Sequence, residues 1–223
     1  MMDFNQFESF ITTSFPELGK EAMDRYHLLE GLYLDWNSKI NVISRKDIGG
    51  LYEHHVLHSL AIARYLKVML PDEYERFLLP ESGLTVLDLG TGGGFPGIPL
   101  AIMFPGVRFT LCDSIRKKTV VAEDVAKSLG LNNVEVVNAR AESLPGKFDY
   151  VVSRAVASLT DFYPWVKGKY SRGILYLKGG DINEDISSLM ERNRMKKGSI
   201  STWPVDSWLT DSYFEGKFVI NIL

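Results

Sequence analysis

The spacing of hydrophobic residues changes near residue 83 and divides the chain into two regions. Before this point, apolar positions recur at intervals of three and four, which is typical of helices packed on one face. The pattern predicts helices over residues 4–15, from Pro16 to about residue 36, and over 51–70, where Pro71 is expected to end the third helix. A polar connector occupies residues 37–50. We therefore expect a helical extension over residues 1–80.

After residue 83, short apolar runs alternate with amphipathic stretches. The runs predict strands over residues 84–89, 107–113, 134–139, 148–155 and 173–180. Helices are expected over 97–104, over 114–130 with Ser114 as its N-cap and Gly130 at its end, and from the fifth strand to about residue 195. Residues 199–205 and 217–223 predict a closing antiparallel pair. This alternation indicates an α/β domain over residues 81–223, built on a parallel, doubly wound sheet.

Composition narrows the class of protein. The 223 residues carry a net charge of -3, which argues against a globally basic nucleic-acid binder. Any RNA contact must use local basic runs, which lie at Arg45-Lys46, at 116–118 and at 192–197. The single cysteine, Cys112, excludes an internal disulfide, and we see neither a signal pattern nor a run long enough for a membrane span. We expect a cytoplasmic protein, with a monomer as the default.

Five glycines lie within eight positions of the stretch "VLDLGTGGGFPGIPL", residues 86–100. The stretch follows the first predicted strand, at the sheet edge where parallel α/β proteins bind ligands. A phosphate-binding loop needs Lys-Ser or Lys-Thr directly after its last glycine, whereas Ile98 and Pro99 follow Gly97. This excludes a phosphate-binding loop and leaves a dinucleotide site, a site for S-adenosylmethionine, or a purely structural turn.

A dinucleotide fits the glycine spacing but not the neighbouring residues. The segment from Gly92 to Gly97 matches G-x-G-x-x-G, and Asp113 follows about 20 residues later, where a ribose-binding acid belongs. However, Asp88 would place a negative charge beside the pyrophosphate. The two prolines that flank Gly97 also lack the amide donors that a helix start offers to phosphate.

S-adenosylmethionine suits the same turn better, because it carries an ammonium and a sulfonium but no phosphate. Asp88 can attract its cationic methionine end through water, and Gly90, Gly92 and Gly94 let the backbone come close. Asp113 ends the second predicted strand, where its carboxylate can accept both ribose hydroxyls. We therefore favour S-adenosylmethionine as the cofactor.

Five segments occur in the order and spacing of one known family: "DLGTGGGFPGIPLAI", "DSIRKKTVVAEDVAKSLGL", "RAE", "FDYVVSRAVASL" and "LKGG". They resemble the bacterial small-subunit ribosomal RNA guanine-N7 methyltransferases (methyltransferase G), also called the glucose-inhibited division protein B family. Upstream, "WNSKINVIS" and "HHVLHSL" resemble the helical N-terminal region of that family. The family usually has Asp-Ser where this chain has His58-Ser59, and Asn-Leu-Thr where it has Asn41-Val42-Ile43.

The resemblance implies a Rossmann-like methyltransferase that transfers a methyl group from S-adenosylmethionine to N7 of a guanine in 16S ribosomal RNA. Its cofactor positions correspond here to Gly90, Phe95, Ala141, Glu142 and Arg154. Asp113, Arg140 and Lys178 match further family positions near the site. We expect catalytic parts for Arg154 and Lys178, and RNA contacts from Arg140, Arg116, Lys117 and Lys118.

The segment "SRAVASL" after the fourth predicted strand agrees with an N7 acceptor. It lacks the Pro-Pro-aromatic turn favoured for methylation of exocyclic amines. Methylation of a pyrimidine ring carbon needs a cysteine nucleophile, but Cys112, the single cysteine, lies in the middle of a predicted strand. Guanine N7 has a free lone pair and no proton to lose, so in-line attack on the methyl group needs positioning but no general base. Methylation of a ribose hydroxyl, with Lys178 helping to activate it, remains an alternative.

Two other groups of residues have competing interpretations. His54 and His58 share a helix face, as zinc ligands can, but no cysteine or acid completes a ligand set with them and His55. We expect no metal there, and a packing or RNA-facing role instead. The cations at 116–118 oppose the dipole of their helix start, which favours a phosphate-facing role, although a solvated face explains them nearly as well.

Two alternative functions remain open from the sequence. The G-x-G-x-x-G match allows a nicotinamide-dependent oxidoreductase. The protein could also be a non-catalytic, RNA-binding assembly factor that retains the glycine turn of residues 90–97 but carries out no reaction there. We expect neither a membrane nor a metal partner.

Overall fold

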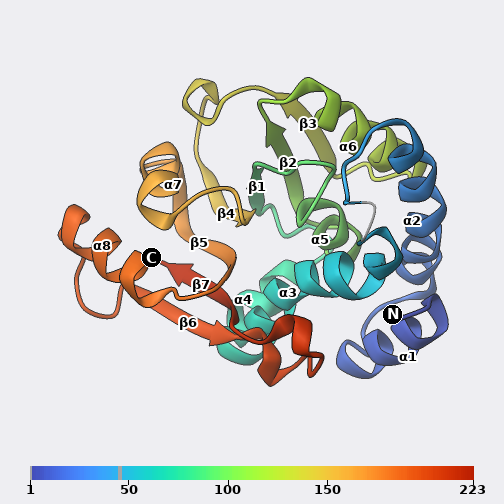
Figure 1. The fold of residues 1–223 in the computed structure, drawn as a ribbon, viewed down its shortest axis with the longest axis horizontal. Helices are drawn as coiled ribbons and strands as arrows, with labels where there is room; N and C mark the ends of the chain where they lie inside the picture. Colours follow the sequence, from blue (N-terminus) through green and yellow to red (C-terminus); the bar gives the residue numbers. More distant parts are fainter. Residues whose placement is uncertain (1, 45–46) are drawn as a thin grey trace.

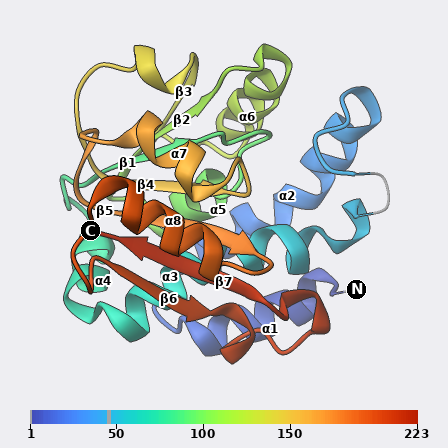
Figure 2. The same ribbon diagram turned by 60° about the vertical axis from the view of Figure 1, so that its left-hand side comes forward.

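The computed structural model describes residues 2–44 and 47–223, so the basic pair Arg45-Lys46 lies outside the described residues. Within these residues, seven strands form one sheet in the order β3-β2-β1-β4-β5-β7-β6 (Figures 1 and 2). The strands are β1 (Thr85–Leu89), β2 (Arg108–Asp113), β3 (Val134–Asn138), β4 (Phe148–Arg154), β5 (Tyr170–Gly179), β6 (Ile200–Pro204) and β7 (Lys217–Ile222).

Strands β1 to β5 pair in parallel, and β7 pairs antiparallel with both β5 and β6. The order reverses at β1, which lies between β2 and β4. In a parallel sheet this reversal leaves a crevice beyond the carboxyl ends of the strands, where ligands bind. The structure confirms the α/β fold, the parallel sheet and the closing antiparallel pair.

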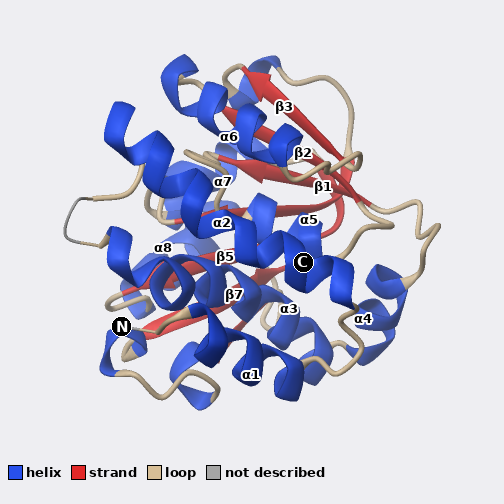
Figure 3. Cartoon of the chain, turned by 90° about the vertical axis from the view of Figure 1, so that its right-hand side faces the viewer, coloured by secondary structure: helices blue, strands red, loops and turns tan. Residues whose placement is uncertain are grey.

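Helices cover both faces of the sheet (Figure 3). Helices α2 (Lys20–Lys39), α3 (His58–Met69), α5 (Gly97–Met103) and α6 (Arg116–Ser128) lie on one face, and α7 (Leu159–Val166) and α8 (Asn183–Asn193) lie on the other. Helices α1 (Phe4–Ser14) and α4 (Pro71–Leu78) pack with the first group. None of the helices in residues 2–44 and 47–223 is long and apolar enough to cross a membrane.

The helical region shares one core with the sheet. A single cluster of buried side chains contains Phe7 of α1 and Tyr26 of α2 together with Val86 and Phe109 of the first two strands. The Tyr26 hydroxyl donates a hydrogen bond to the carbonyl of Pro99 in α5, at 2.9 Å. The predicted boundary near residue 80 falls between α4 and β1 in the chain, but the hydrophobic packing continues across it.

Two predicted helix starts are wrong, those at Pro16 and Ser114. Pro16 lies in a tight turn closed by the Leu18 amide and the Phe15 carbonyl, so α2 begins only at Lys20. The predicted end of the third helix before Pro71 is confirmed, since α3 ends at Met69; Pro71 also begins α4, because proline fits the first helical position. Ser114 does not cap α6; Ile115 is the N-cap.

Besides short 3-10 turns, three elements were not predicted: α4, a π-helix and α7. A π-helix, Leu51–Leu57, precedes α3 where the pattern predicts a continuous α-helix. Helix α7 was missed, although Ser158 and Asp161 carry a capping signal: the Asp161 amide donates to the Ser158 hydroxyl at 3.1 Å.

Candidate active site

A cavity of about 730 Å³ opens at the carboxyl ends of the parallel strands. Its walls come from the turn after β1, the ends of β2 and β4, and the segment after β3. The helical region and α7 add one side chain each. The cavity residues used below are Val42, Gly90, Gly92, Gly93, Phe95, Asp113, Lys118, Arg140, Ala141, Glu142, Arg154, Val156 and Trp165. The structure thus brings together residues from six separate parts of the sequence.

The glycine turn after β1 needs glycine for two physical reasons. Gly90 has a φ of +74°, and a Cβ there would lie 2.4 Å from Cγ2 of Val156. Gly94 has a φ of +113°, and a Cβ there would lie 2.4 Å from Cδ1 of Ile98. Both positions combine a left-handed backbone with close packing, which only glycine tolerates. The turn therefore presents bare backbone to the cavity.

Asp88 lies behind this turn and does not line the cavity. Its fully buried carboxylate accepts hydrogen bonds at Oδ2 from the Thr91 hydroxyl, at 2.6 Å, and from the Gly97 amide, at 2.8 Å. Oδ1 is buried without a hydrogen-bond partner among the described residues. Burial raises the pKa of Asp88 to about 7. Asp88 thus fixes the turn to the start of α5, and its part in cofactor binding stays a prediction that would act through the turn.

Asp113 ends β2 and faces the cavity. Its Oδ2 accepts a hydrogen bond from the Gly92 amide at 2.9 Å, and its Oδ1 accepts one from the Ile115 amide at 2.8 Å. These two amides fix the direction of the carboxylate. Because each carboxylate oxygen has two lone pairs, both oxygens can still accept a hydroxyl from a ligand.

The segment after β3 forms a second wall. Ala141 is buried at the start of a short 3-10 turn, while Arg140 and Glu142 are exposed at the rim. Trp165 of α7 also lines this side of the cavity. The sequence analysis missed Trp165, because α7 itself was not recognised.

Arg154, at the end of β4, is held by residues of the helical region. One terminal nitrogen donates to the carbonyl of His54 at 3.3 Å, and the other lies 3.1 Å from Nδ1 of His55. Its Cζ lies 5.2 Å from the centroid of the Phe95 ring, in a cation–π arrangement. Burial lowers the pKa of Arg154, but a guanidinium remains charged in proteins. The site thus contains a cation whose direction is set by three contacts.

The other predicted basic residues differ in their distance from the cavity. Lys118 lines it, whereas Arg116 and Lys117 are exposed on the first turn of α6. Lys178 is not among the lining residues: its Nζ forms an ion pair with Asp185 of α8 at 2.9 Å. Asp185 also accepts the amide of Leu159. Lys178 therefore stabilises the packing of α7 and α8 in this structure, and a catalytic part for it stays a prediction.

His54 and His55 both contact the carboxylate of Asp47, a contact that the sequence analysis did not predict. Asp47 contacts Nδ1 of His54 at 2.5 Å and Nε2 of His55 at 2.8 Å. His58 is buried among Tyr213 and Phe214 and has no hydrogen-bond partner in the described chain. Among residues 2–44 and 47–223, no three His, Cys, Asp or Glu side chains are arranged to hold a metal ion.

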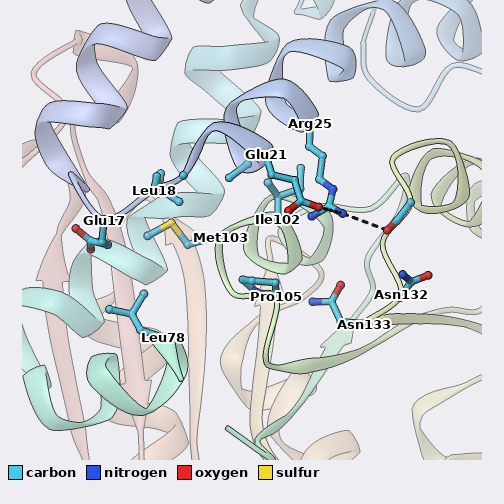
Figure 4. A pocket seen from close by; sticks show the side chains of 13 residues that line it. Glu17, Leu18, Glu21, Arg25, Leu78, Ile102, Met103, Pro105, Asn132 and Asn133 are labelled. Carbon is cyan, nitrogen blue, oxygen red and sulfur yellow. Dashed lines mark hydrogen bonds and ion pairs between the residues drawn. The ribbon is translucent and has the colours of Figure 1, made fainter. Parts of the chain in front are cut away.

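A second cavity, of about 410 Å³, lies between the start of α2, the end of α5 and the loop before β3 (Figure 4). Its polar side chains are engaged in joining these elements. Arg25 donates to the carbonyls of Leu129 and Gly130, and the Asn133 side-chain amide donates to three carbonyls around the end of α5. This cavity marks a structural junction.

Comparison with known proteins decides the family. The family model described as "GidB: rRNA small subunit methyltransferase G" matches residues 21–206. The chain belongs to this family. Among its family relatives, the methyltransferase G of Flavobacterium psychrophilum is 46% identical over 220 residues, covering 95% of this chain and 96% of the relative. That of Christiangramia forsetii is 48% identical over 214 residues, covering 92% of each.

Solved structures agree with the fold of the family. Magnesium protoporphyrin IX methyltransferase from Synechocystis, with bound S-adenosylmethionine, matches 92% of this chain and 97% of its own, with a TM-score of 0.59 at 17% identity. The ribosomal protein L11 methylase of Lactobacillus delbrueckii matches 75% of this chain and 76% of its own, with a TM-score of 0.52 at 18% identity. The resemblance seen in the sequence is confirmed, and the fold is the Rossmann-like fold of S-adenosylmethionine-dependent methyltransferases.

Proposed function

We propose that this protein transfers a methyl group from S-adenosylmethionine to N7 of a guanine in 16S ribosomal RNA. One observation carries the proposal. Five residues at the expected cofactor positions, which come from three segments of the sequence, all line the same cavity: Gly90, Phe95, Ala141, Glu142 and Arg154. The names of the relatives in the family, ribosomal RNA small subunit methyltransferase G, support the substrate class.

The residues present fit S-adenosylmethionine. The cavity volume lies within the range of about 300 to 1,000 Å³ typical of small-molecule sites. The bare backbone of the glycine turn admits the methionine end, and the Asp113 carboxylate has acceptors left for ribose hydroxyls. Ala141 and Trp165 offer an apolar wall for a flat ring. When bound, the cofactor supplies an activated methyl group on a sulfonium.

The residues around the cavity suit a methyl transfer that depends on the alignment of the reacting groups and needs no general base. Asp113 is the carboxylate fixed at the cavity wall, and both of its oxygens already accept backbone amides. Glu142 lies at the exposed rim. A guanine N7 needs neither as a base, because it has no proton to lose. We propose that Arg154 and the glycine turn hold the reacting groups in line, which is the main requirement of such a transfer.

RNA would approach the rim of the cavity. Lys118 lines the opening, and Arg140, Arg116 and Lys117 are exposed near it, on the segment after β3 and the first turn of α6. Their cations can bind phosphates without sequence preference, so RNA binding should weaken as salt is raised. We propose that these four residues position the RNA and that the cavity selects the base.

The test uses small ribosomal subunits from a bacterial strain that lacks this methyltransferase. The purified protein is incubated with the subunits and labelled S-adenosylmethionine, and the modified nucleotide is mapped by mass spectrometry. We expect a single 7-methylguanosine in 16S ribosomal RNA. A label on a ribose or on an exocyclic amine would overturn the N7 assignment. Absence of any label, while calorimetry shows cofactor binding, would favour an assembly factor, and binding of a nicotinamide dinucleotide alone would favour an oxidoreductase.

A further inference from the structure

Arg154 is oriented by groups that do not neutralise its charge. Its hydrogen-bond partners are a backbone carbonyl and an imidazole, and its face lies on the ring of Phe95. The ion pairs formed by the described residues do not include Arg154. Its positive charge is therefore held in place at the cavity wall while it remains available to a ligand.

The contact between Arg154 and His55 fixes the tautomer of the imidazole. A guanidinium nitrogen can only donate a hydrogen bond, so Nδ1 of His55, 3.1 Å away, must accept and carry no proton. The proton of a neutral ring is then on Nε2, which lies 2.8 Å from the Asp47 carboxylate and donates to it. Arg154 thus donates to His55, and His55 donates to Asp47, so every group in this chain of hydrogen bonds has a suitable partner.

The charge state of His55 agrees with this order. Burial, and after it the positive charge of Arg154, lower the pKa of His55 to about 4. A protonated ring would have no acceptor for Arg154 and would place a second cation beside it. Burial alone would raise the pKa of Asp47, but hydrogen bonds from His54 and His55 outweigh it and lower that pKa. A charged Asp47 and a neutral His55 are therefore the stable pair.

The local backbone explains how one carboxylate reaches two consecutive side chains. His54 and His55 lie in the π-helix Leu51–Leu57, whose turns are wider than those of an α-helix, and such turns are frequent at functional sites. The same π-helix turns the His54 carbonyl toward Arg154. His54 is held from its other side by the ring of Tyr213, with the ring centroids 3.7 Å apart.

We propose that Asp47 and His55 are positioning residues of the active site, with Asp47 fixing the His55 tautomer and His55 directing the guanidinium of Arg154 into the cavity. This inference rests on the proposed function, because it assigns these residues to the same site. It adds a part of the helical region to the machinery that prepares the cavity for an anionic or electron-rich ligand group.

Two substitutions at His55 separate the two hydrogen bonds of its ring. In His55→Asn, the side-chain oxygen can take the place of Nδ1 and accept from Arg154, while the contact with Asp47 is lost. In His55→Gln, the longer amide reaches the place of Nε2 but puts no acceptor at the place of Nδ1. We expect His55→Gln to weaken S-adenosylmethionine binding by about 10-fold or more, as for a lost hydrogen bond to a charged group, and His55→Asn to restore most of the affinity.

Calorimetry with S-adenosylmethionine and the isolated protein gives the first readout. His27→Gln serves as the matched control, since His27 is exposed and stacks on Phe4 of the helical region. Equal affinities for His55→Gln, His55→Asn and the unchanged protein would overturn the proposal. So would equal losses in the two His55 variants, because a merely structural histidine would not distinguish them. Asp47→Asn provides a second site of substitution if His55→Gln does not fold.

The tautomer itself gives the second readout and needs no folded variant. Long-range proton–nitrogen spectra of the imidazole rings distinguish a protonated from an unprotonated Nδ1, and the sequence holds only four histidines to assign. We expect His55 at pH 7 to be neutral with its proton on Nε2. A proton on Nδ1 would overturn the proposal.

The two proposals fail in distinguishable ways. If the unchanged protein neither binds S-adenosylmethionine nor methylates the small subunit, the proposed function fails. If it does both, and His55→Gln does so with the same affinity and rate, only the positioning role fails.

Discussion

The amide of Gly97 donates to Oδ2 of Asp88 at 2.8 Å, and a Cβ at position 97 would lie only 2.6 Å from that same oxygen. It would also lie 2.8 Å from Cγ of Leu111. We therefore expect Gly97→Ala to destabilise the fold by about 1 to 3 kcal/mol, the usual cost of overpacking a core. Urea unfolding followed by circular dichroism measures this change.

The matched control is Gly31→Ala, in the exposed middle of α2, where a Cβ meets nothing within 4 Å. Helix propensity alone should make this variant about 0.5 to 1 kcal/mol more stable. If both variants shifted stability in the same direction, close packing between Gly97 and Asp88 would not be the cause.

The buried Asp88 should make stability depend on pH. Its pKa is raised by burial from 3.8 to about 7, so the folded state holds a proton that the unfolded state releases. The stability from this group is present below pH 4 and is lost as pH rises through 7. Asp88→Asn keeps an acceptor for Thr91 and Gly97 but cannot ionise. We expect the free energy of unfolding of Asp88→Asn, relative to the unchanged protein, to increase from pH 5 to pH 8.

Comparing the two proteins at each pH removes the effect of the buried histidines, which titrate in both. Burial and Arg154 lower the pKa of His55 and of His58, so their stability is lost as pH falls below 6.5. A pH-independent difference between Asp88→Asn and the unchanged protein would mean that Asp88 is ionised throughout this range.

Removing the carboxylate of Asp113 should affect binding and local order together. Asp113→Ala leaves the amides of Gly92 and Ile115 without their acceptors. We expect S-adenosylmethionine affinity, measured by calorimetry, to fall by about 1 to 3 kcal/mol. Glu135→Ala is the control, because Glu135 is an exposed acid on the neighbouring strand β3. Unchanged affinity in Asp113→Ala would place the ribose elsewhere.

Two tyrosines of α2 provide a matched pair of hydroxyl deletions. The buried hydroxyl of Tyr33 donates to the carbonyl of Gly93 in the glycine turn at 2.8 Å, whereas that of Tyr26 donates to Pro99 in α5 at 2.9 Å. Each change to phenylalanine should cost about 1 to 2 kcal/mol of stability. Only Tyr33→Phe should also weaken S-adenosylmethionine binding, as measured by calorimetry. Equal affinities in the two variants would mean that Tyr33 does not hold the turn.

Much of the fold could be predicted because its signals are local. The apolar runs predicted all seven strands, and their alternation with helices indicated the parallel sheet. Errors arose where one residue permits two local structures. A proline such as Pro16 fits a turn as well as a helix start. Pro71 ends the third helix as predicted, but the same residue also begins α4, which was not predicted. The π-helix at Leu51–Leu57 could not be predicted from periodicity, because the apolar pattern of residues 51–70 also fits an α-helix.

The candidate site was predictable where glycines and strand ends mark it, and hidden where it depends on packing. The turn from Gly90 to Gly94 and the acid at Asp113 were both recognised from sequence. The junction of Asp47, His55 and Arg154 was not, because Asp47 is eight positions from His55 and Arg154 is 99 positions from it. The spacing of residues along the sequence does not predict contacts that form only when distant elements pack together.

The contact between the helical region and the glycine turn has a consequence for how this enzyme can be divided. Tyr33 holds the Gly93 carbonyl, and the side chain of Val42 lies so close that a Cβ at Gly93 would come within 3.1 Å of it. A fragment starting at residue 81 would carry the whole turn but lack the outer wall that shapes it. For protein engineering, a transferable unit must therefore include the helical region that carries Tyr33 and Val42, and substitutions upstream of the sheet can change the shape of the cavity.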